Sequence, residues 1–415
     1  YDGTTSAAGT FTILTNFWTY TPKSGVVGTP VVVNGNGFGA NENIRVTFGN
    51  NTTITTATTD DRGLFTSGFT VDLQVYGTKT VKAVGLTSNP EFEDVFNVTS
   101  VITSMSPTIG SVTTQITISG NGFGANEGLR IAYGNNTAIG ETTTDNNGSF
   151  STTFIIDTQT YGTRSVIATG LTSGRADSRL LKLVARMWQV SPNTGTVGTK
   201  ITVWGDGYTD DETIQVYFKN ILASDTGLVT TNINGSYSAS FVVTTQVAGT
   251  TTINAIGNGI NKSNQTTENT YWITSQITSV TPASGPVGTK VTVKGTGYSN
   301  AESVRISFGT NQSITNVTTS GYGTFSTVFT VDTQAIGTTT ITATGEITSD
   351  DDIFVIRTGI ATIMPASGTA GRLVSITGGG YMAGEGVNIK FGQNLLINTC
   401  TADGNGWIEG TFTVD

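Results

Sequence analysis

Apolar and polar residues alternate in short runs along the whole chain. In VRISF, residues 304–308, the Val, Ile and Phe positions are separated by Arg and Ser. The same spacing occurs in IRVTF at 44–48 and in KVTVK at 290–294. A period of two is typical of a strand that buries one face and exposes the other. The pattern therefore predicts antiparallel sheets in which one face is covered and the other is wet.

The alternating runs belong to five copies of one longer unit. Each copy opens with a proline, and successive prolines are 85, 85, 90 and 83 residues apart. Thirteen residues after each proline comes a glycine, followed by a second glycine and an aromatic residue. A repeat of this length matches a small independent domain better than a solenoid repeat. The prolines are Pro22, Pro107, Pro192, Pro282 and Pro365, and the G-x-G-aromatic motifs are residues 35–38, 120–123, 205–208, 295–298 and 378–381.

Turn residues recur at a fixed place inside each copy. A four-residue segment begins with Asp, Asn or Ser and ends with Gly, which is the preference of a type I turn. About seven short strands fit between such turns in one copy. We therefore predict an all-β chain of tandem immunoglobulin-like β-sandwich domains in an extended rod. The turn segments are residues 60–63, 145–148, 232–235, 320–323 and 403–406.

The two ends of the chain do not fit a whole number of domains. Phe11 and Ile13 resemble the last strand of a domain, and Asp415 is equivalent to Asp72 within the first copy. We favour a piece of a longer repeat protein; the alternative is an N-terminal strand that completes an open domain in a neighbouring molecule. We assign residues 1–16 to the last strand of a preceding or partner domain. Units 1 to 5 are then residues 17–100, 101–186, 187–275, 276–358 and 359–415, and the fifth unit lacks its last strands.

The repeated segment resembles a known domain family. In unit 4 it is PASGPVGTKVTVKGTGY, residues 282–298, and the pattern P-x-x-G-x-x-G-T-x-V-x-V-x-G-x-G-Y/F recurs in the other copies. It is similar to the IPT/TIG immunoglobulin-like domain, in the form found in tandem on prokaryotic surface proteins. The resemblance is specific for the fold and loose for function, because such units occur in surface-layer proteins, adhesins, receptors, polysaccharide enzymes and transcription factors. Unit 2 departs at Thr113, where the other units have Gly, which puts one turn in doubt.

Composition argues against several classes of function. The formal charge is −9, so no basic stripe is available to neutralise nucleic-acid phosphates. No apolar stretch reaches the roughly 20 residues that span a bilayer. The chain has no His, and Cys400 is its one cysteine, which removes the commonest general base and any internal disulfide. We expect no enzyme and no cofactor; a pair of carboxylates in a cleft is the remaining catalytic alternative.

The G-x-G motif raises the question of a phosphate-binding loop. A dinucleotide loop needs a third glycine, a helix after it and an acidic residue about 20 positions later. Here another alternating strand follows the glycines, and the motif occurs five times. We interpret the glycines as a bend at a strand end, with the aromatic side chain in the core.

One carboxylate recurs in every unit, seven residues after the first glycine of the motif. We interpret it as an acceptor of backbone N–H bonds or a partner of a cross-strand Arg. The alternative is a calcium ligand, helped by acids near the domain junctions, although the sequence contains no D-x-D-x-D-G loop. The candidate glutamates are Glu42, Glu127, Glu212, Glu302 and Glu385, and the nearby acids are Asp206, Asp210, Asp211, Asp351 and Asp352.

Sequons for N-linked glycans are frequent, as expected by chance in a chain rich in Asn and Thr. They matter only if the protein passes through a compartment that glycosylates it. The candidates are Asn51, Asn97, Asn147, Asn234, Asn261, Asn264, Asn311 and Asn316; Asn50 and Asn135 also fit the pattern.

We expect a structural, extracellular protein, a segment of a surface layer or similar assembly. Its partners would be copies of itself, other surface proteins and cell-envelope glycans. The linkers between units are short and contain no Gly or Pro hinge, which favours a stiff rod on the order of 150–170 Å long. The alternatives are an adhesin or glycan-binding stalk and a filament subunit assembled by strand donation. A binding stalk predicts exposed aromatic residues on one unit; Trp188 and Trp204 point to unit 3, although we expect most of its Trp side chains in the core.

Overall fold

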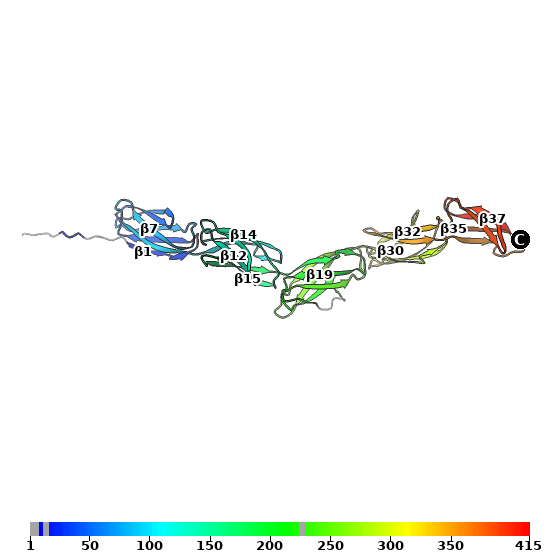
Figure 1. Cartoon of the computed structure of the whole chain (residues 1–415), viewed down its shortest axis with the longest axis horizontal. Helices are drawn as coiled ribbons and strands as arrows, with labels where there is room; N and C mark the ends of the chain where they lie inside the picture. The colour runs from blue at the N-terminus through cyan, green and yellow to red at the C-terminus, as the bar shows by residue number, and fades with distance from the viewer. Residues whose placement is uncertain (1–7, 11–15, 224–228) are drawn as a thin grey trace, which may run out of the picture.

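The chain folds into five β-sandwiches laid end to end. The computed structural model describes residues 8–10, 16–223 and 229–415, and within these residues every regular element is a strand. Figure 1 shows the sandwiches following one another along one long axis, from unit 1 in blue to unit 5 in red. The predicted fold class, tandem immunoglobulin-like sandwiches in an extended rod, is confirmed. Phe11 and Ile13 lie outside the described residues.

Unit 1 shows the architecture that units 2 to 4 repeat. A three-stranded sheet packs on a five-stranded sheet, and neighbouring strands are antiparallel except for one short parallel pair, β2 with β8. The first sheet has the order β1 (Asn16–Thr21), β3 (Pro30–Asn36), β6 (Phe65–Thr70). The second has the order β2 (Ser24–Gly25), β8 (Glu91–Val98), β7 (Gly77–Gly85), β4 (Asn43–Phe48), β5 (Asn51–Thr58).

Units 2 to 4 keep this strand order, except that in unit 3 two short strands, β21 (Ile221–Leu222) and β22 (Val229–Thr230), take the place of the single edge strand. Unit 2 contains β9 (Val101–Ser106), β11 (Gln115–Asn121) and β14 (Phe150–Ile155) opposite β10 (Ile109–Gly110), β16 (Ala176–Leu183), β15 (Gly162–Gly170), β12 (Gly128–Tyr133) and β13 (Asn136–Thr143). Unit 3 contains β17 (Arg186–Ser191), β19 (Lys200–Asp206) and β23 (Tyr237–Val242) opposite β18 (Thr194–Gly195), β25 (Thr266–Ile273), β24 (Gly249–Asn258), β20 (Thr213–Phe218), β21 (Ile221–Leu222) and β22 (Val229–Thr230). Unit 4 contains β26 (Gln276–Thr281), β28 (Lys290–Thr296) and β31 (Phe325–Thr330) opposite β27 (Ser284–Gly285), β33 (Ser349–Ile356), β32 (Gly337–Thr344), β29 (Ser303–Phe308) and β30 (Asn311–Thr318).

Each unit has its own hydrophobic core, made by the inward residues of the alternating runs. In β4 the side chains of Ile44, Val46 and Phe48 are fully buried, and the intervening residues face outward. The aromatic residue of the G-x-G motif turns inward as predicted. The ring of Phe123, for example, meets Phe150 edge-on with centroids 5.5 Å apart. Apolar burial of this kind is the main term that stabilises a small sandwich.

Unit 5 is the exception, because it has fewer strands. Its two sheets are β34 (Gly359–Met364), β35 (Leu373–Gly379), β38 (Ile408–Thr413) and the pair β36 (Gly386–Phe391), β37 (Asn394–Thr401). Within residues 359–415 nothing corresponds to β32 and β33 of unit 4. Apolar side chains that other units bury are therefore exposed here; Ile360, for example, is 58% exposed, whereas its counterpart Ile277 in unit 4 is 7% exposed.

Candidate functional site: repeated domain junctions and an aromatic groove

The same backbone hydrogen bond joins each unit to the next. The residue that precedes the first glycine of β7, or of its counterpart, donates its N–H to the carbonyl oxygen of the aromatic residue in the next G-x-G motif. The four bonds are Tyr76 to Phe123 at 3.1 Å, Tyr161 to Tyr208 at 2.8 Å, Ala248 to Tyr298 at 3.0 Å and Ile336 to Tyr381 at 3.4 Å. The motif first considered as a phosphate loop thus supplies an acceptor at every junction.

In units 2 to 5 the second glycine of the motif lies directly under the linker from the preceding unit. Only two residues separate the last strand of one unit from the first strand of the next, as between β25 and β26. A Cβ on Gly297 would lie 2.5 Å from the carbonyl oxygen of Thr274 in that linker, and a Cβ on Gly122 would lie 2.6 Å from that of Thr99. Both glycines also have positive φ, of 75° and 72°. The motif therefore requires glycine for contact with the linker as well as for the bend.

The junction between units 2 and 3 carries an additional side-chain contact. Thr113, the residue that replaces the usual glycine, keeps the turn with φ of 69°. Its hydroxyl accepts a hydrogen bond from Nη1 of Arg186 at 2.7 Å, and the Arg186 Nε lies 2.9 Å from Oδ1 of Asp206. The departure that put the turn in doubt in fact leaves the turn intact and provides a contact to the next unit.

The recurring glutamate holds two loops of its own unit together. In unit 1 the Glu42 carboxylate accepts N–H bonds from Gly39 at 2.7 Å, Thr87 at 2.7 Å and Ser88 at 2.6 Å. Glu127 does the same in unit 2, and Glu212 and Glu302 in units 3 and 4, where all of these side chains are buried. Glu385 of unit 5 is exposed and accepts the N–H of Met382 at 2.8 Å.

These hydrogen bonds determine the ionisation of the carboxylate. Burial acts to raise the pKa of Glu42, but the bonds from Ser88, Thr87 and Gly39 outweigh it and lower the pKa to about 2. Burial and the same kind of bonds, mainly from Ser173 and Gly124, leave the pKa of Glu127 below its ordinary value. Both glutamates are therefore anionic at neutral pH, with N–H donors pointing at their oxygens.

Most of the acids considered with them as calcium ligands are engaged or placed elsewhere. Asp206 pairs with Arg186, and Asp351 and Asp352 lie on β33, whereas Asp210 and Asp211 are exposed in the turn just before Glu212. No group of three or more Asp, Glu or Cys residues that could hold a metal occurs in the part of the chain that the structure describes. The Arg that follows in unit 2, Arg130, lies 3.6 Å from Glu141 and not beside Glu127.

The sequon asparagines fall into two groups. Asn51 and Asn311 are half-buried, and their Nδ2 groups donate to Asp72 at 2.9 Å and to Asp332 at 2.8 Å. A sugar on such a nitrogen would replace one of its two hydrogens and would have to fit beside the carboxylate that the other one binds. The other six candidates are exposed: Asn97, Asn147, Asn234, Asn261, Asn264 and Asn316.

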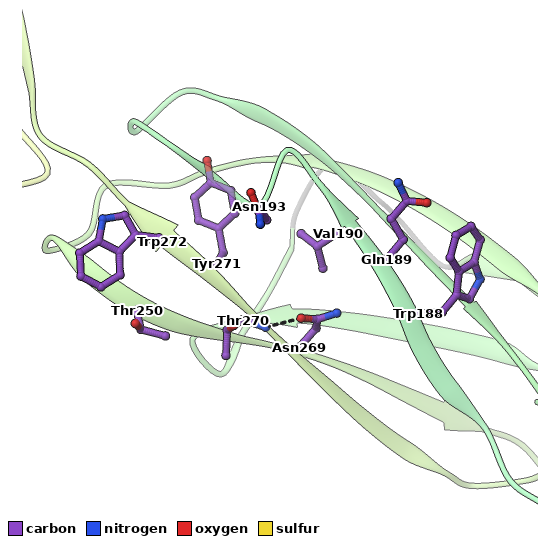
Figure 2. A pocket seen from close by; sticks show the side chains of 9 residues that line it. All are labelled: Trp188, Gln189, Val190, Asn193, Thr250, Asn269, Thr270, Tyr271 and Trp272. Carbon is purple, nitrogen blue, oxygen red and sulfur yellow. Dashed lines mark hydrogen bonds between the residues drawn. The ribbon is translucent and has the colours of Figure 1, made fainter. Parts of the chain in front are cut away.

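Unit 3 carries an aromatic groove that the sequence located only in part. Trp188 and Trp272 are 48% and 41% exposed, so the expectation that most Trp side chains of this unit lie in the core is wrong. Figure 2 shows Trp188 near one end of the groove and Trp272 near the other, with Val190, Asn269 and Thr270 between them. The groove has a volume of about 420 Å³ and is lined by Trp188, Gln189, Val190, Asn193, Thr250, Asn269, Thr270, Tyr271 and Trp272.

Backbone irregularity and packing explain the exposure of Trp188. The pairing of β17 with β19 shifts between Met187 and Gln189, so Trp188 is the extra residue of a β-bulge. A bulge re-aims the side chain of its extra residue. The half-buried ring of Trp204 lies behind it, with ring centroids 6.1 Å apart and an interplanar angle of 37°. Trp204 thus supports Trp188 at the surface.

No catalytic arrangement is assembled in the described residues. Cys400 is half-buried beside the unit 5 core, and burial raises the pKa of its thiol, which disfavours the reactive thiolate. The buried tyrosines Tyr208 and Tyr298 have pKa values raised chiefly by burial, so they serve as core residues. None of the described residues forms a helix long and apolar enough to cross a membrane.

Comparison with known proteins bears on the family and the fold. Residues 275–354, which cover unit 4, match the IPT/TIG domain. The chain is a tandem array of immunoglobulin-like domains. No curated protein sequence matches the chain.

The solved structures that match the chain are only distantly alike. The D1–D4 ectodomain fragment of ICAM-5 has 11% identity and a TM-score of 0.23, and the match covers 82% of this chain and 100% of that one. Invasin, a bacterial integrin-binding protein, has 12% identity and a TM-score of 0.22, with 96% of this chain and 100% of that one covered. SGBP-B of Bacteroides ovatus, solved with a mixed-linkage heptasaccharide, has 12% identity and a TM-score of 0.22, with 70% and 82% covered.

Proposed function

We propose that the chain is a structural protein of the cell surface, a stiff spacer within a surface layer or a similar extracellular assembly. The observation that carries the proposal is the junction: four consecutive junctions share one interdomain hydrogen bond and one glycine–linker contact. Flexible linkers between domains have no reason to repeat such geometry, whereas a rod of fixed length does. The chain has one cysteine and no histidine, so it offers no Cys–His pair whose catalytic role would compete with a structural one.

The experiment that tests the proposal has a structural and a cellular part. Small-angle X-ray scattering of the 415-residue chain should give a maximum dimension on the order of 175–200 Å, from about 35–40 Å for each sandwich along the rod. Immunogold labelling of intact cells with an antibody against the chain should decorate the outer surface. A compact particle in solution would contradict the spacer, and labelling confined to the cell interior would contradict the location.

The exposed sequons fit the same setting. We expect any N-linked glycans on the six exposed candidates, of which Asn147 and Asn234 lie in the type I turns, and not on Asn51 or Asn311. Intact mass and glycopeptide mapping of the native protein test this expectation. Modification at Asn51 or Asn311 with their Asp partners in place would contradict it.

Strand donation between molecules is the second candidate, because unit 5 offers an open edge. The strand β36 pairs with β37 on one side, and within residues 359–415 no strand pairs with its other side. In unit 4 the equivalent side of β29 is covered by β32. If a second copy supplied that strand, the chain would form oligomers whose size rises with concentration. Light scattering that shows a monomer at all concentrations would exclude this assembly.

A further inference from the structure

The groove of unit 3 occupies a seam that every complete unit has. It lies between the first strand, β17, and residues 269–272 of β25 on the opposite sheet. Asn269 of β25 lines the groove and pairs with Ile253 of β24. By the same register its counterparts are Asp94 in unit 1, Arg179 in unit 2 and Asp352 in unit 4. Unit 3 is therefore the unit in which this position carries no charge.

Unit 1 shows how the seam is closed in the same fold. Tyr20 takes the place of Val190; it is buried, and its hydroxyl donates to the carbonyl oxygen of Val95. Lys23 takes the place of Asn193, and its Nζ lies 3.3 Å from the centroid of the Tyr20 ring and 2.7 Å from Oδ2 of Asp94. A ring and an ion pair thus fill the volume that unit 3 leaves open.

The chemistry of the groove indicates one class of ligand. The lining contains no Asp, Glu, Lys or Arg, so it offers no partner for a charged ligand. It combines the two exposed indole rings with the amide groups of Gln189, Asn193 and Asn269 and the hydroxyl of Thr250. Indoles pack against flat apolar faces, and amides and hydroxyls exchange hydrogen bonds with neutral hydroxyls. A pyranose ring offers both kinds of surface at once.

We infer that this groove binds a neutral oligosaccharide, with sugar rings packed on Trp188 and Trp272 and hydroxyl groups bonded to the amides between them. The two indoles lie near opposite ends of the groove (Figure 2), which suits a chain of several sugar units better than a single one. The bulge at Trp188 and the supporting ring of Trp204 hold the first indole in place without a ligand, which lowers the entropy cost of binding. This role goes beyond that of a spacer and does not depend on it.

The test is a titration of the 415-residue chain with a panel of neutral hexasaccharides. Cellohexaose, xylohexaose, mannohexaose, maltohexaose and chitohexaose are the probes, followed by intrinsic Trp fluorescence and calorimetry, with hexagalacturonic acid as the charged comparison. We expect at least one neutral probe to bind with a Kd below about 1 mM. Trp188→Ala and Trp272→Ala should each weaken binding about tenfold or more, because each removes a central apolar contact.

A second variant keeps both indoles and closes the groove instead. The triple variant V190Y/N193K/N269D copies into unit 3 the residues that fill the seam of unit 1, so its fold has a precedent in the same chain. It should weaken binding at least as much as either single Trp variant. Tyr322→Ala, which removes an exposed aromatic ring of unit 4, is the matched control and should bind like the unchanged chain.

Three results would overturn the inference. They are no binding of any neutral probe at about 1 mM, binding that the two Trp variants and the triple variant leave unchanged, and preference for the charged hexasaccharide. The scattering profile of the same variants separates this question from the spacer proposal, since a rod of unchanged length that binds no sugar contradicts only the groove.

Discussion

At the scale of single residues, two glycines with the same backbone conformation have different reasons to be glycine. Gly297 and Gly288 both have positive φ, of 75° and 90°. A Cβ on Gly297 would collide with the linker carbonyl of Thr274, whereas a Cβ on Gly288 would meet nothing within 4 Å. The first position is therefore restricted by packing and conformation, and the second by conformation alone.

This difference predicts different costs for the two alanine variants. Gly288→Ala should lower the free energy of unfolding of unit 4 by about 1–2 kcal/mol, the cost of a left-handed residue with a Cβ. Gly297→Ala should cost about 1–3 kcal/mol more, because the linker must also move. Hydrogen exchange of residues 276–358 in the full chain measures both. Equal effects of the two variants would show that the linker contact is unimportant. Thr113, which in unit 2 occupies the position of Gly288 and has φ of 69°, shows that this fold accommodates a residue with a Cβ there.

The lowered pKa of Glu42 makes the stability of unit 1 depend on pH. The ordinary pKa of 4.5 applies in the unfolded chain and about 2 in the folded one. Its stabilisation is therefore fully present above about pH 4.5 and is lost as the pH falls toward 2. E42Q should lower stability at neutral pH by about 1–3 kcal/mol, because an amide nitrogen faces N–H donors. It should also remove this acid sensitivity. Calorimetry of both proteins across that window tests the prediction; parallel curves would contradict it.

The same carboxylate geometry predicts no effect of calcium. The oxygens of Glu42 already accept three N–H bonds, and the positive ends of those N–H groups would repel a cation at the same place. Thermal unfolding curves of the chain with millimolar calcium and with chelator should therefore coincide. A higher melting temperature in calcium would contradict this prediction and restore the recurring glutamates as ligand candidates.

At the scale of strands, the fifth unit should be the least stable part of the 415-residue chain. It lacks counterparts of β32 and β33 within residues 359–415. Its buried apolar residues are Val374, Ile376, Ile389, Ala402, Ile408 and Phe412, fewer than in any of the other four units. Less apolar burial means less stabilisation per unit. Hydrogen exchange should show β36 and β38 exchanging faster than their counterparts β29 and β31 in unit 4. Equal protection in the two units would contradict the prediction.

The strands and turns could be predicted from the sequence because they rest on local patterns. The alternation of apolar and polar residues identified strands such as β29. The type I turns were located by four-residue segments that begin with Asp, Asn or Ser and end with Gly. The exposure of Trp188 could not be predicted, since alternation alone does not reveal the bulge that turns its side chain outward. The groove also depends on the absence of a large side chain at Val190 and of charge at Asn269. That signal was present in the sequence, but it becomes meaningful only once the strand register aligns these residues with Tyr20 and Asp94.

At the scale of the whole molecule, the stiffness that we propose rests on backbone contacts that no side-chain pattern encodes. The junction bond runs from an N–H group to a carbonyl oxygen, so residues as different as Tyr76, Ala248 and Ile336 can donate it. Sequence comparison of these positions reveals no common side chain, although the acceptor lies in the most regular motif of the chain. The short linkers were visible in the sequence; the bond that orients one sandwich on the next was not.

Lengthening one linker should therefore bend the rod without unfolding it. Inserting Gly-Ser-Gly between Thr274 and Ser275 would separate unit 3 from unit 4 and break both the Ala248–Tyr298 bond and the contact of the linker with Gly297. Each sandwich keeps its own core, so the melting profile should change little, while small-angle scattering should show a shorter mean dimension and a broader distance distribution. The same insertion between Asp61 and Arg62, in the exposed turn of unit 1, is the control and should leave the scattering profile of a straight rod. If both insertions scatter like the unchanged chain, the junction contacts do not set the shape, and the spacer proposal loses its main support.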